Sequence, residues 1–138
     1  MVSEKKNILF ICKYNRFRSK VAEAIFKKYN KNSNFKARSA GIKKATIKNP
    51  FQRAICKSVG IKIDSPPKIL NKKLIEWSDM IILVSDEVSP TIFEDYKKNG
   101  KKVIVWRIAD AKVNDKRDII KTVKKIRKKV TEFIKNLE

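Results

Sequence analysis

The sequence has 138 residues, of which 42% are apolar, and this length favours a single folded domain spanning residues 1–138. No segment is long and apolar enough to cross a bilayer, and the first apolar run is too short for a signal peptide. We therefore expect a cytoplasmic protein with no membrane partner. The formal charge is +21, but the cations are spread along the whole chain. This spread favours solvated surfaces, and a nucleic acid remains the less favoured alternative partner.

Short apolar runs alternate with amphipathic segments from the first residues onward. Residues 8–12 form a continuous apolar run that is typical of a buried parallel strand. Ser19 is suited to cap a helix over about 20–30. A second strand is predicted over 35–39. The apolar face of the first helix is expected to carry Val21, Ala22, Ile25, Phe26 and Tyr29.

Capping residues indicate where the later helices begin. Asn49-Pro50 and Ser89-Pro90 each combine a capping side chain with a proline suited to the first helical position, and Asn71 is a further cap. The last segment has one long apolar stripe opposite a lysine-rich face that we interpret as solvated. The expected elements are helices over about 50–59, 71–77, 90–97 and 115–137 and strands over 80–84 and 102–106.

Four short apolar strands separated by helices predict an α/β fold, a three-layer sandwich around a four-stranded parallel sheet. In such sheets ligands bind beyond the carboxyl ends of the strands, at the topological switch point. The loop that leaves the first strand is therefore the candidate site. It reads "CKYNRFRS" and comprises Cys12, Lys13, Tyr14, Asn15, Arg16, Phe17, Arg18 and Ser19.

The spacing in this loop suits the binding of an oxyanion. A loop that curls into a new helix can direct its backbone N–H groups and the positive end of the helix dipole at one point. Arg18 can grip two oxygens of a phosphate, and the same field favours a nucleophilic thiolate on Cys12. Ser19 can donate its hydroxyl to that thiolate, and Asn15 tolerates the left-handed backbone that the turn needs. The chain contains no histidine, so no Cys–His pair can activate the thiol, and no metal site is indicated.

The segment "ICKYNRFRSKVAEAIF" resembles the signature of low-molecular-weight protein tyrosine phosphatases and the related thiol arsenate reductases. Their loop reads Cys-x-Gly-Asn-x-Cys-Arg-Ser and is followed by Ala-Glu in the helix. The resemblance continues in "RSAG" at 38–41, "SDMIILVSDE" at 78–87 and "VWRIADAK" at 105–112. The matching loop and helix positions are Cys12, Asn15, Arg18, Ser19, Ala22 and Glu23.

The resemblance implies the phosphatase fold and a metal-independent, cofactor-free phosphatase. It implies Cys12 as nucleophile, Arg18 as oxyanion ligand and Asp110 as general acid, with Asn15, Ser19 and Ser39 as supporting residues. Its implied ligands are phosphate and vanadate, and its implied substrates are phosphorylated proteins, phosphotyrosine above all, or small phosphate esters. A monomer is expected.

Several positions depart from the family pattern. Tyr14 replaces the loop glycine, Phe17 replaces the second loop cysteine, and Ala111 and Lys112 replace the proline and the aromatic residue after the acid. Two alternatives therefore stay open. The first is an arsenate reductase, although Cys56 is the only other cysteine and is predicted to be a buried core thiol. The second is a catalytically degenerate module that binds phosphate or nucleic acid.

Overall fold

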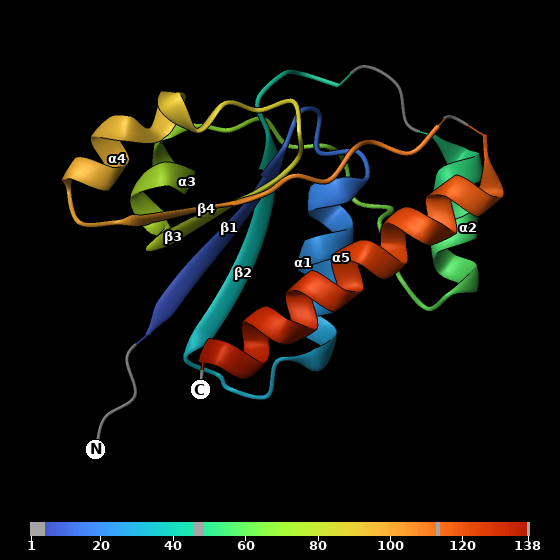
Figure 1. The fold of residues 1–138 in the computed structure, drawn as a ribbon, viewed down its shortest axis with the longest axis horizontal. Coiled ribbons are helices and arrows are strands. Elements are labelled where there is room, and N and C mark those ends of the chain that lie inside the picture. Colours follow the sequence, from blue (N-terminus) through green and yellow to red (C-terminus); the bar gives the residue numbers. More distant parts are fainter. Residues whose placement is uncertain (1–4, 46–48, 113, 138) are drawn as a thin grey trace.

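The protein, described by a computed structural model over residues 5–45, 49–112 and 114–137, has a parallel β-sheet with helices on both faces (Figure 1). The four strands lie in the order β2-β1-β3-β4, which confirms the predicted fold class. The strands are β1 (Lys6–Cys12), β2 (Phe35–Gly41), β3 (Met80–Val84) and β4 (Lys102–Trp106), and the helices are α1 (Arg18–Tyr29), α2 (Pro50–Ser58), α3 (Lys72–Trp77), the 3-10 helix η1 (Pro90–Phe93), α4 (Glu94–Lys98) and α5 (Lys116–Leu137).

Strand β1 has its side chains alternately in two separate cores. Ile8 and Phe10 pack in the core beneath α1, α2 and α5, whereas Leu9 and Ile11 pack in the core beneath α3 and α4. All four side chains are fully buried. Burial on both faces is why this strand is a continuous apolar run with no alternation of polar residues.

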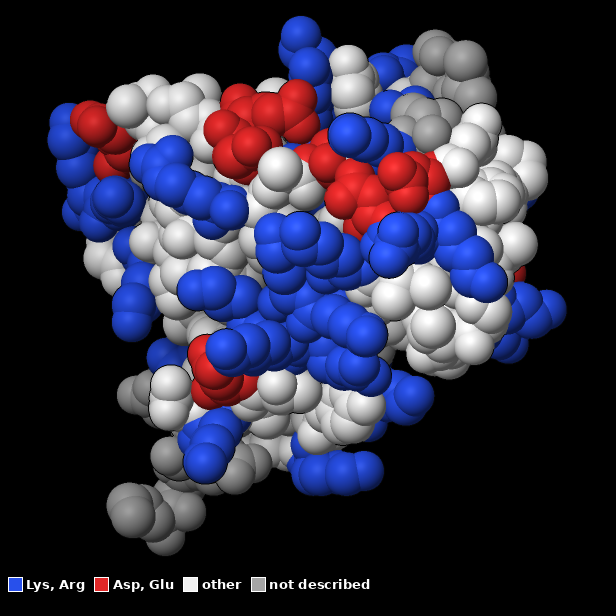
Figure 2. All heavy atoms as spheres, turned by 45° about the vertical axis from the view of Figure 1, so that its right-hand side comes forward, with Lys and Arg blue, Asp and Glu red and all other residues white. Residues whose placement is uncertain are grey.

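Helix α5 covers one face of the sheet and packs against α1 and α2 (Figure 1). The predicted stripe holds, because Ile119, Val123, Ile126 and Val130 are buried. In Figure 2 a band of Lys and Arg crosses the face on which α5 lies. Across the described ranges, no helix is long and apolar enough to span a membrane. The exposed cations of α5 are Lys116, Arg117, Lys121, Lys124, Lys125, Arg127, Lys128, Lys129 and Lys135.

Two sequence expectations for α1 are wrong. The helix begins at Arg18, so Ser19 lies inside its first turn and Phe17 occupies the cap position. The side chain of Phe17 cannot accept a hydrogen bond, and the amides of the first turn keep the unmet donors of a helix N-terminus. Tyr29 is 39% exposed rather than part of the core, because the helix ends there.

The order of the strands determines where the candidate ligand site lies. Strand β2 pairs with one edge of β1 and β3 pairs with the other, so the chain turns in opposite directions after β1 and β3. This is the topological switch point of the sheet, where the loops leave room for a ligand. The segments that follow β1, β3 and β4 therefore meet at the same edge.

Candidate active site

The loop from Cys12 to Ser19 curls over the carboxyl end of β1. Asn15 has a φ of 57°, which is the left-handed conformation predicted for the turn. The chain then enters α1 directly at Arg18. The result is a turn whose concave side lies next to the amides of a helix N-terminus, an arrangement that favours anions.

The sulfur of Cys12 lies inside this turn. Its Sγ is 3.0 Å from the Ser19 hydroxyl oxygen and accepts a hydrogen bond from the Asn15 amide at 3.3 Å. The Ser19 hydroxyl already accepts from the Asn15 side-chain amide at 2.7 Å, so its own hydrogen is available for Cys12. Two donors therefore converge on the sulfur, as a thiolate requires.

Asn15 is the centre of the network behind the loop. Its Oδ1 accepts from the Lys68 backbone amide at 2.9 Å, which fixes the orientation of the side-chain amide. Its Nδ2 donates to Ser19 and, at 3.0 Å, to the Ser39 hydroxyl. Ser39 in turn donates to Glu23 at 2.5 Å. Because Asn15, Ser19 and Ser39 are fully buried, each hydrogen bond has a defined donor and the loop has one stable arrangement.

The Glu23 carboxylate terminates this chain of hydrogen bonds. Burial alone would raise the pKa of Glu23, but hydrogen bonds from Lys27 and Ser39 lower it below its ordinary value. Glu23 is therefore a carboxylate near neutral pH. An acceptor with no proton forces Ser39 to be the donor, and Ser39 must then accept from Asn15.

Gly41 allows the loop to approach β2. It pairs with Cys12 across the two parallel strands. A Cβ at this position would lie 2.5 Å from the Tyr14 carbonyl carbon and 2.7 Å from the Asn15 nitrogen. No other residue type fits there without displacing the loop backbone.

Arg18 is 2% exposed and is held by groups that follow β3 and β4. Its Nη1 donates to the Ser85 hydroxyl at 3.1 Å and to the Ile108 carbonyl at 3.0 Å. Its Nη2 donates to Glu87 at 2.5 Å, and this hydrogen bond lowers the pKa of the Glu87 carboxyl. Asp86 adds a longer ion pair at 3.6 Å. The guanidinium is therefore fixed at the switch point rather than exposed on the surface.

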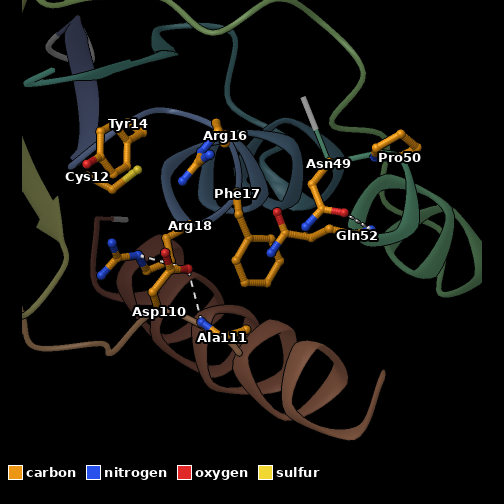
Figure 3. A pocket seen from close by; sticks show the side chains of 10 residues that line it. All are labelled: Cys12, Tyr14, Arg16, Phe17, Arg18, Asn49, Pro50, Gln52, Asp110 and Ala111. Carbon is orange, nitrogen blue, oxygen red and sulfur yellow. Dashed lines mark hydrogen bonds and ion pairs between the residues drawn. The ribbon is translucent and has the colours of Figure 1, made fainter. Parts of the chain in front are cut away.

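Asp110 shares a pocket with Cys12 and Arg18 (Figure 3). The pocket has a volume of about 350 Å³. The Asp110 Oδ1 lies 3.7 Å from the Arg18 Nε and accepts from the Ala111 amide at 3.0 Å. The structure thus brings together the three residues that the resemblance implied as catalytic. The remaining lining residues are Tyr14, Arg16, Phe17, Asn49, Pro50, Gln52 and Ala111.

The other loop residues have different surroundings. Lys13 turns toward Glu87, with its Nζ 3.4 Å from a carboxylate oxygen. The Tyr14 ring forms a wall of the pocket. The Arg16 guanidinium lies over this ring, 4.6 Å from the ring centre. Phe17 is 3% exposed and packs in the core beneath α1.

Sequence reasoning missed several of these contacts. Ser85 and Glu87 follow β3 directly, and the rule that parallel strands end at one edge would have indicated them. No sequence signal marked Gln52 as a pocket residue or the Lys68 amide as the partner of Asn15. In the described part of the chain, no cluster of three or more Cys, Asp or Glu side chains is placed to hold a metal ion.

Cys56 is fully buried within α2, in the core beneath α5. Burial raises the pKa of its thiol to about 12. The expectation of a buried core thiol is therefore correct. A thiol of this kind is protonated at neutral pH and does not act as a nucleophile.

Comparison with known proteins gives a consistent family. Residues 7–138 match the family model described as "Low molecular weight phosphotyrosine protein phosphatase". An arsenate reductase of Brevibacillus brevis is 35% identical over 94 residues, which is 65% of this chain and 69% of the relative.

Two solved structures are similar over most of the chain. The YwlE arginine phosphatase of Geobacillus stearothermophilus superposes with a TM-score of 0.81 at 19% identity, covering 96% of this chain and 92% of that one. An arsenate reductase of Archaeoglobus fulgidus superposes with a TM-score of 0.73 at 27% identity, covering 92% and 98%. The relatives thus include both phosphatases and arsenate reductases.

Replacing Gly41 tests the close approach of the loop. We expect Gly41→Ala to lower the free energy of unfolding by about 1–3 kcal/mol, because a methyl group would overlap the loop backbone. Phosphate binding should weaken strongly in the same variant. Gly100→Ala is the control, since Gly100 has a φ of +81° but no heavy atom within 4 Å of the added Cβ. It should cost roughly 1 kcal/mol of backbone strain and leave phosphate binding intact. Equal phosphate affinity in both variants, measured by isothermal calorimetry, would contradict this account.

The two thiols should differ in reactivity. We expect at most one thiol of the folded protein to react with a disulfide reagent at neutral pH, and phosphate should slow that reaction because Cys12 lies in the pocket. Cys56 should react only after denaturation, since burial raises its pKa to about 12. The Cys12→Ser variant should show no reactive thiol until it is unfolded. A native Cys12→Ser protein that still reacts would show that Cys56 is accessible.

Proposed function

Since this chain belongs to the low molecular weight phosphotyrosine protein phosphatase family, we propose that it hydrolyses phosphate monoesters, with protein phosphotyrosine as substrate, through a phosphocysteine intermediate. The observation that carries the proposal is the shared pocket of Cys12, Arg18 and Asp110. It supplies a nucleophile, a ligand for oxyanions and a proton donor in one place. On this proposal the protein acts as a cytoplasmic monomer without a metal or cofactor, and phosphate and vanadate are its inhibitory ligands.

In the first step the Cys12 thiolate attacks phosphorus. An S–P bond forms as the P–O bond to the leaving group breaks, and Asp110 transfers its proton to the leaving oxygen. The Arg18 guanidinium and the amides of the loop bind the equatorial oxygens on which charge develops. Ser19 and the Asn15 amide, which donate to the sulfur, hold the thiolate before attack.

In the second step a water molecule attacks the phosphocysteine. The Asp110 carboxylate takes a proton from this water, an O–P bond forms, and the S–P bond breaks to release phosphate and the Cys12 thiolate. The same hydrogen bonds that support the sulfur before attack also support it as a leaving group. Both half-reactions therefore use the same arrangement of residues.

Arsenate reduction is the second candidate, favoured by the arsenate reductase relatives. Reduction requires a further thiol to attack the Cys12–arsenic adduct and take part in a disulfide. Cys56 is buried and protonated, and Phe17 occupies the position of the second loop cysteine. An external thiol would have to perform this step. The structure therefore supports the phosphatase more strongly.

The first experiment measures phosphate release from an aryl phosphate. We expect turnover in the presence of a chelator, and we expect Cys12→Ser to reduce it by about a thousandfold or more because the nucleophile is lost. Vanadate binding should survive in Cys12→Ser, since backbone amides and Arg18 remain. Cys56→Ala is the matched control and should retain turnover.

Two outcomes would overturn this proposal. One is arsenate-dependent oxidation of an added thiol by a protein that releases no phosphate from any ester. The other is appreciable phosphatase activity in the Cys12→Ser variant.

The second experiment concerns Asp110. We expect Asp110→Asn to slow hydrolysis of esters with poor leaving groups by about a hundredfold or more, because a basic leaving oxygen gains most from a proton in the transition state. A nitrophenolate leaving group should be affected much less. Asp115→Asn is the control, because the Asp115 side chain accepts from the Asp118 amide at the start of α5 and does not line the pocket. Equal losses across the leaving-group series would show that Asp110 only shapes the loop.

A further inference from the structure

Two further hollows adjoin the active-site pocket, between the loop, α2 and the segment after it. The first has a volume of about 10 Å³, shares Arg16 and Asn49 with the pocket and is also lined by Lys20 and Arg53. The second shares Arg53 with the first and has a volume of about 260 Å³. Lys57 and Lys62 line it, with Asp64 as its acidic residue. We name the five cations Arg16, Lys20, Arg53, Lys57 and Lys62 the basic track.

The cations nearest the pocket lack carboxylate partners. Arg16 is placed over the Tyr14 ring and, within the described ranges, makes no ion pair. Lys20 is 4% exposed and donates to two neutral oxygens, those of Ser65 at 2.5 Å and Pro66 at 3.1 Å. The buried Nε of Arg53 has no hydrogen-bond partner among the described residues. A buried donor without an acceptor is costly, so this part of the chain keeps an unmet donor next to the hollow.

Five cations and one carboxylate, that of Asp64, line the two hollows. Burial lowers the pKa of Lys20, and the neighbouring Lys68 lowers it further, while Glu23, Cys12 and Asp64 act in the opposite sense. Lys57 and Lys62 are exposed farther along the track. An anionic group bound here would gain charge-assisted hydrogen bonds without displacing any ion pair between residues that the structure describes.

We propose that the substrate is a phosphorylated side chain within an acidic polypeptide segment whose carboxylates bind along the basic track. This inference rests on the proposed phosphatase activity and adds a substrate class to it. The phosphate enters the pocket at Cys12, and the flanking carboxylates reach Arg16, Arg53 and the lysines beyond. Charge complementarity and the position of the track next to the pocket both point to this occupant.

The lining of the track favours a peptide over a nucleic acid. Single-stranded nucleic acids are usually held by aromatic rings on which bases stack. Apart from the acidic Asp64, the described residues that line the two outer hollows are cationic, aliphatic or small and polar, with no aromatic ring. Carboxylates on an extended chain need only the separated cations that the track provides.

The test uses two phosphotyrosine peptides of equal length. One carries glutamates on both sides of the phosphotyrosine, and the other carries glutamines at the same positions. We expect kcat/KM to favour the acidic peptide by roughly tenfold, as a few partly exposed ion pairs would give. The preference should lie mainly in KM and should decrease with added salt.

The triple variant Arg53→Gln, Lys57→Gln, Lys62→Gln should bring the ratio of the two kcat/KM values close to one. The control is the triple variant Lys121→Gln, Lys125→Gln, Lys128→Gln, which removes the same charge from the exposed face of α5 and should preserve the ratio. Thermal unfolding of both variants verifies that they are folded.

The outcomes separate the two proposals. If neither peptide releases phosphate, the proposed function fails. If both peptides are hydrolysed with a ratio near one, or if the α5 variant abolishes the preference as fully as the track variant, the basic track proposal is overturned while the phosphatase stands. Hydrolysis of a 5′-phosphorylated oligonucleotide in preference to both peptides, lost in the track variant, would overturn it in favour of a nucleic acid.

Discussion

A guanidinium that is only 2% exposed must find its partners inside the protein, and Arg18 determines how the ends of three strands are arranged. It lies after β1, yet it is held by Ser85 and Glu87 after β3 and by the Ile108 carbonyl after β4. A buried charge is tolerable only with several well-placed partners. The strand order β1-β3-β4 supplies them from neighbouring strands and brings Asp110 into the same group.

The carboxylates around Arg18 also limit how an anion binds. A hydrogen bond from Arg18 lowers the pKa of Glu87, so this side chain is ionised near neutral pH. A phosphate dianion in the loop must therefore share Arg18 with Glu87. Lys13 reduces the resulting repulsion, because its Nζ lies 3.4 Å from the same carboxylate. On the proposed function, positive charge outside the pocket, including Arg16, then helps to attract the substrate.

The sequence allowed the fold and the position of the loop to be predicted because both depend on local patterns. Apolar runs revealed the buried strands, and the residue type of Asn15 indicated its left-handed turn. The role of Ser19 was only partly predictable. Its hydroxyl lies beside Cys12, as predicted, and also accepts from Asn15, but the predicted role as helix cap is wrong because Phe17 occupies that position. Partners of buried polar groups come from distant segments, so the Lys68 amide could not be predicted from local spacing, and Glu87 only from its place at the end of a neighbouring strand.

The departures from the family pattern become interpretable in the structure. The Tyr14 ring lies against the Arg16 guanidinium, at the start of the basic track, and does not block the turn. Ala111 has an amide hydrogen that a proline lacks, and it donates to the Asp110 Oδ1 at 3.0 Å.

The Arg18 contact with Asp110 is also on Oδ1, and in the described part of the chain Oδ2 has no hydrogen bond. In the proposed mechanism, Oδ2 is therefore the oxygen that carries the transferred proton. Ala111 thus orients the Asp110 carboxylate by a hydrogen bond in place of the ring rigidity of a proline, which supports the role proposed for Asp110.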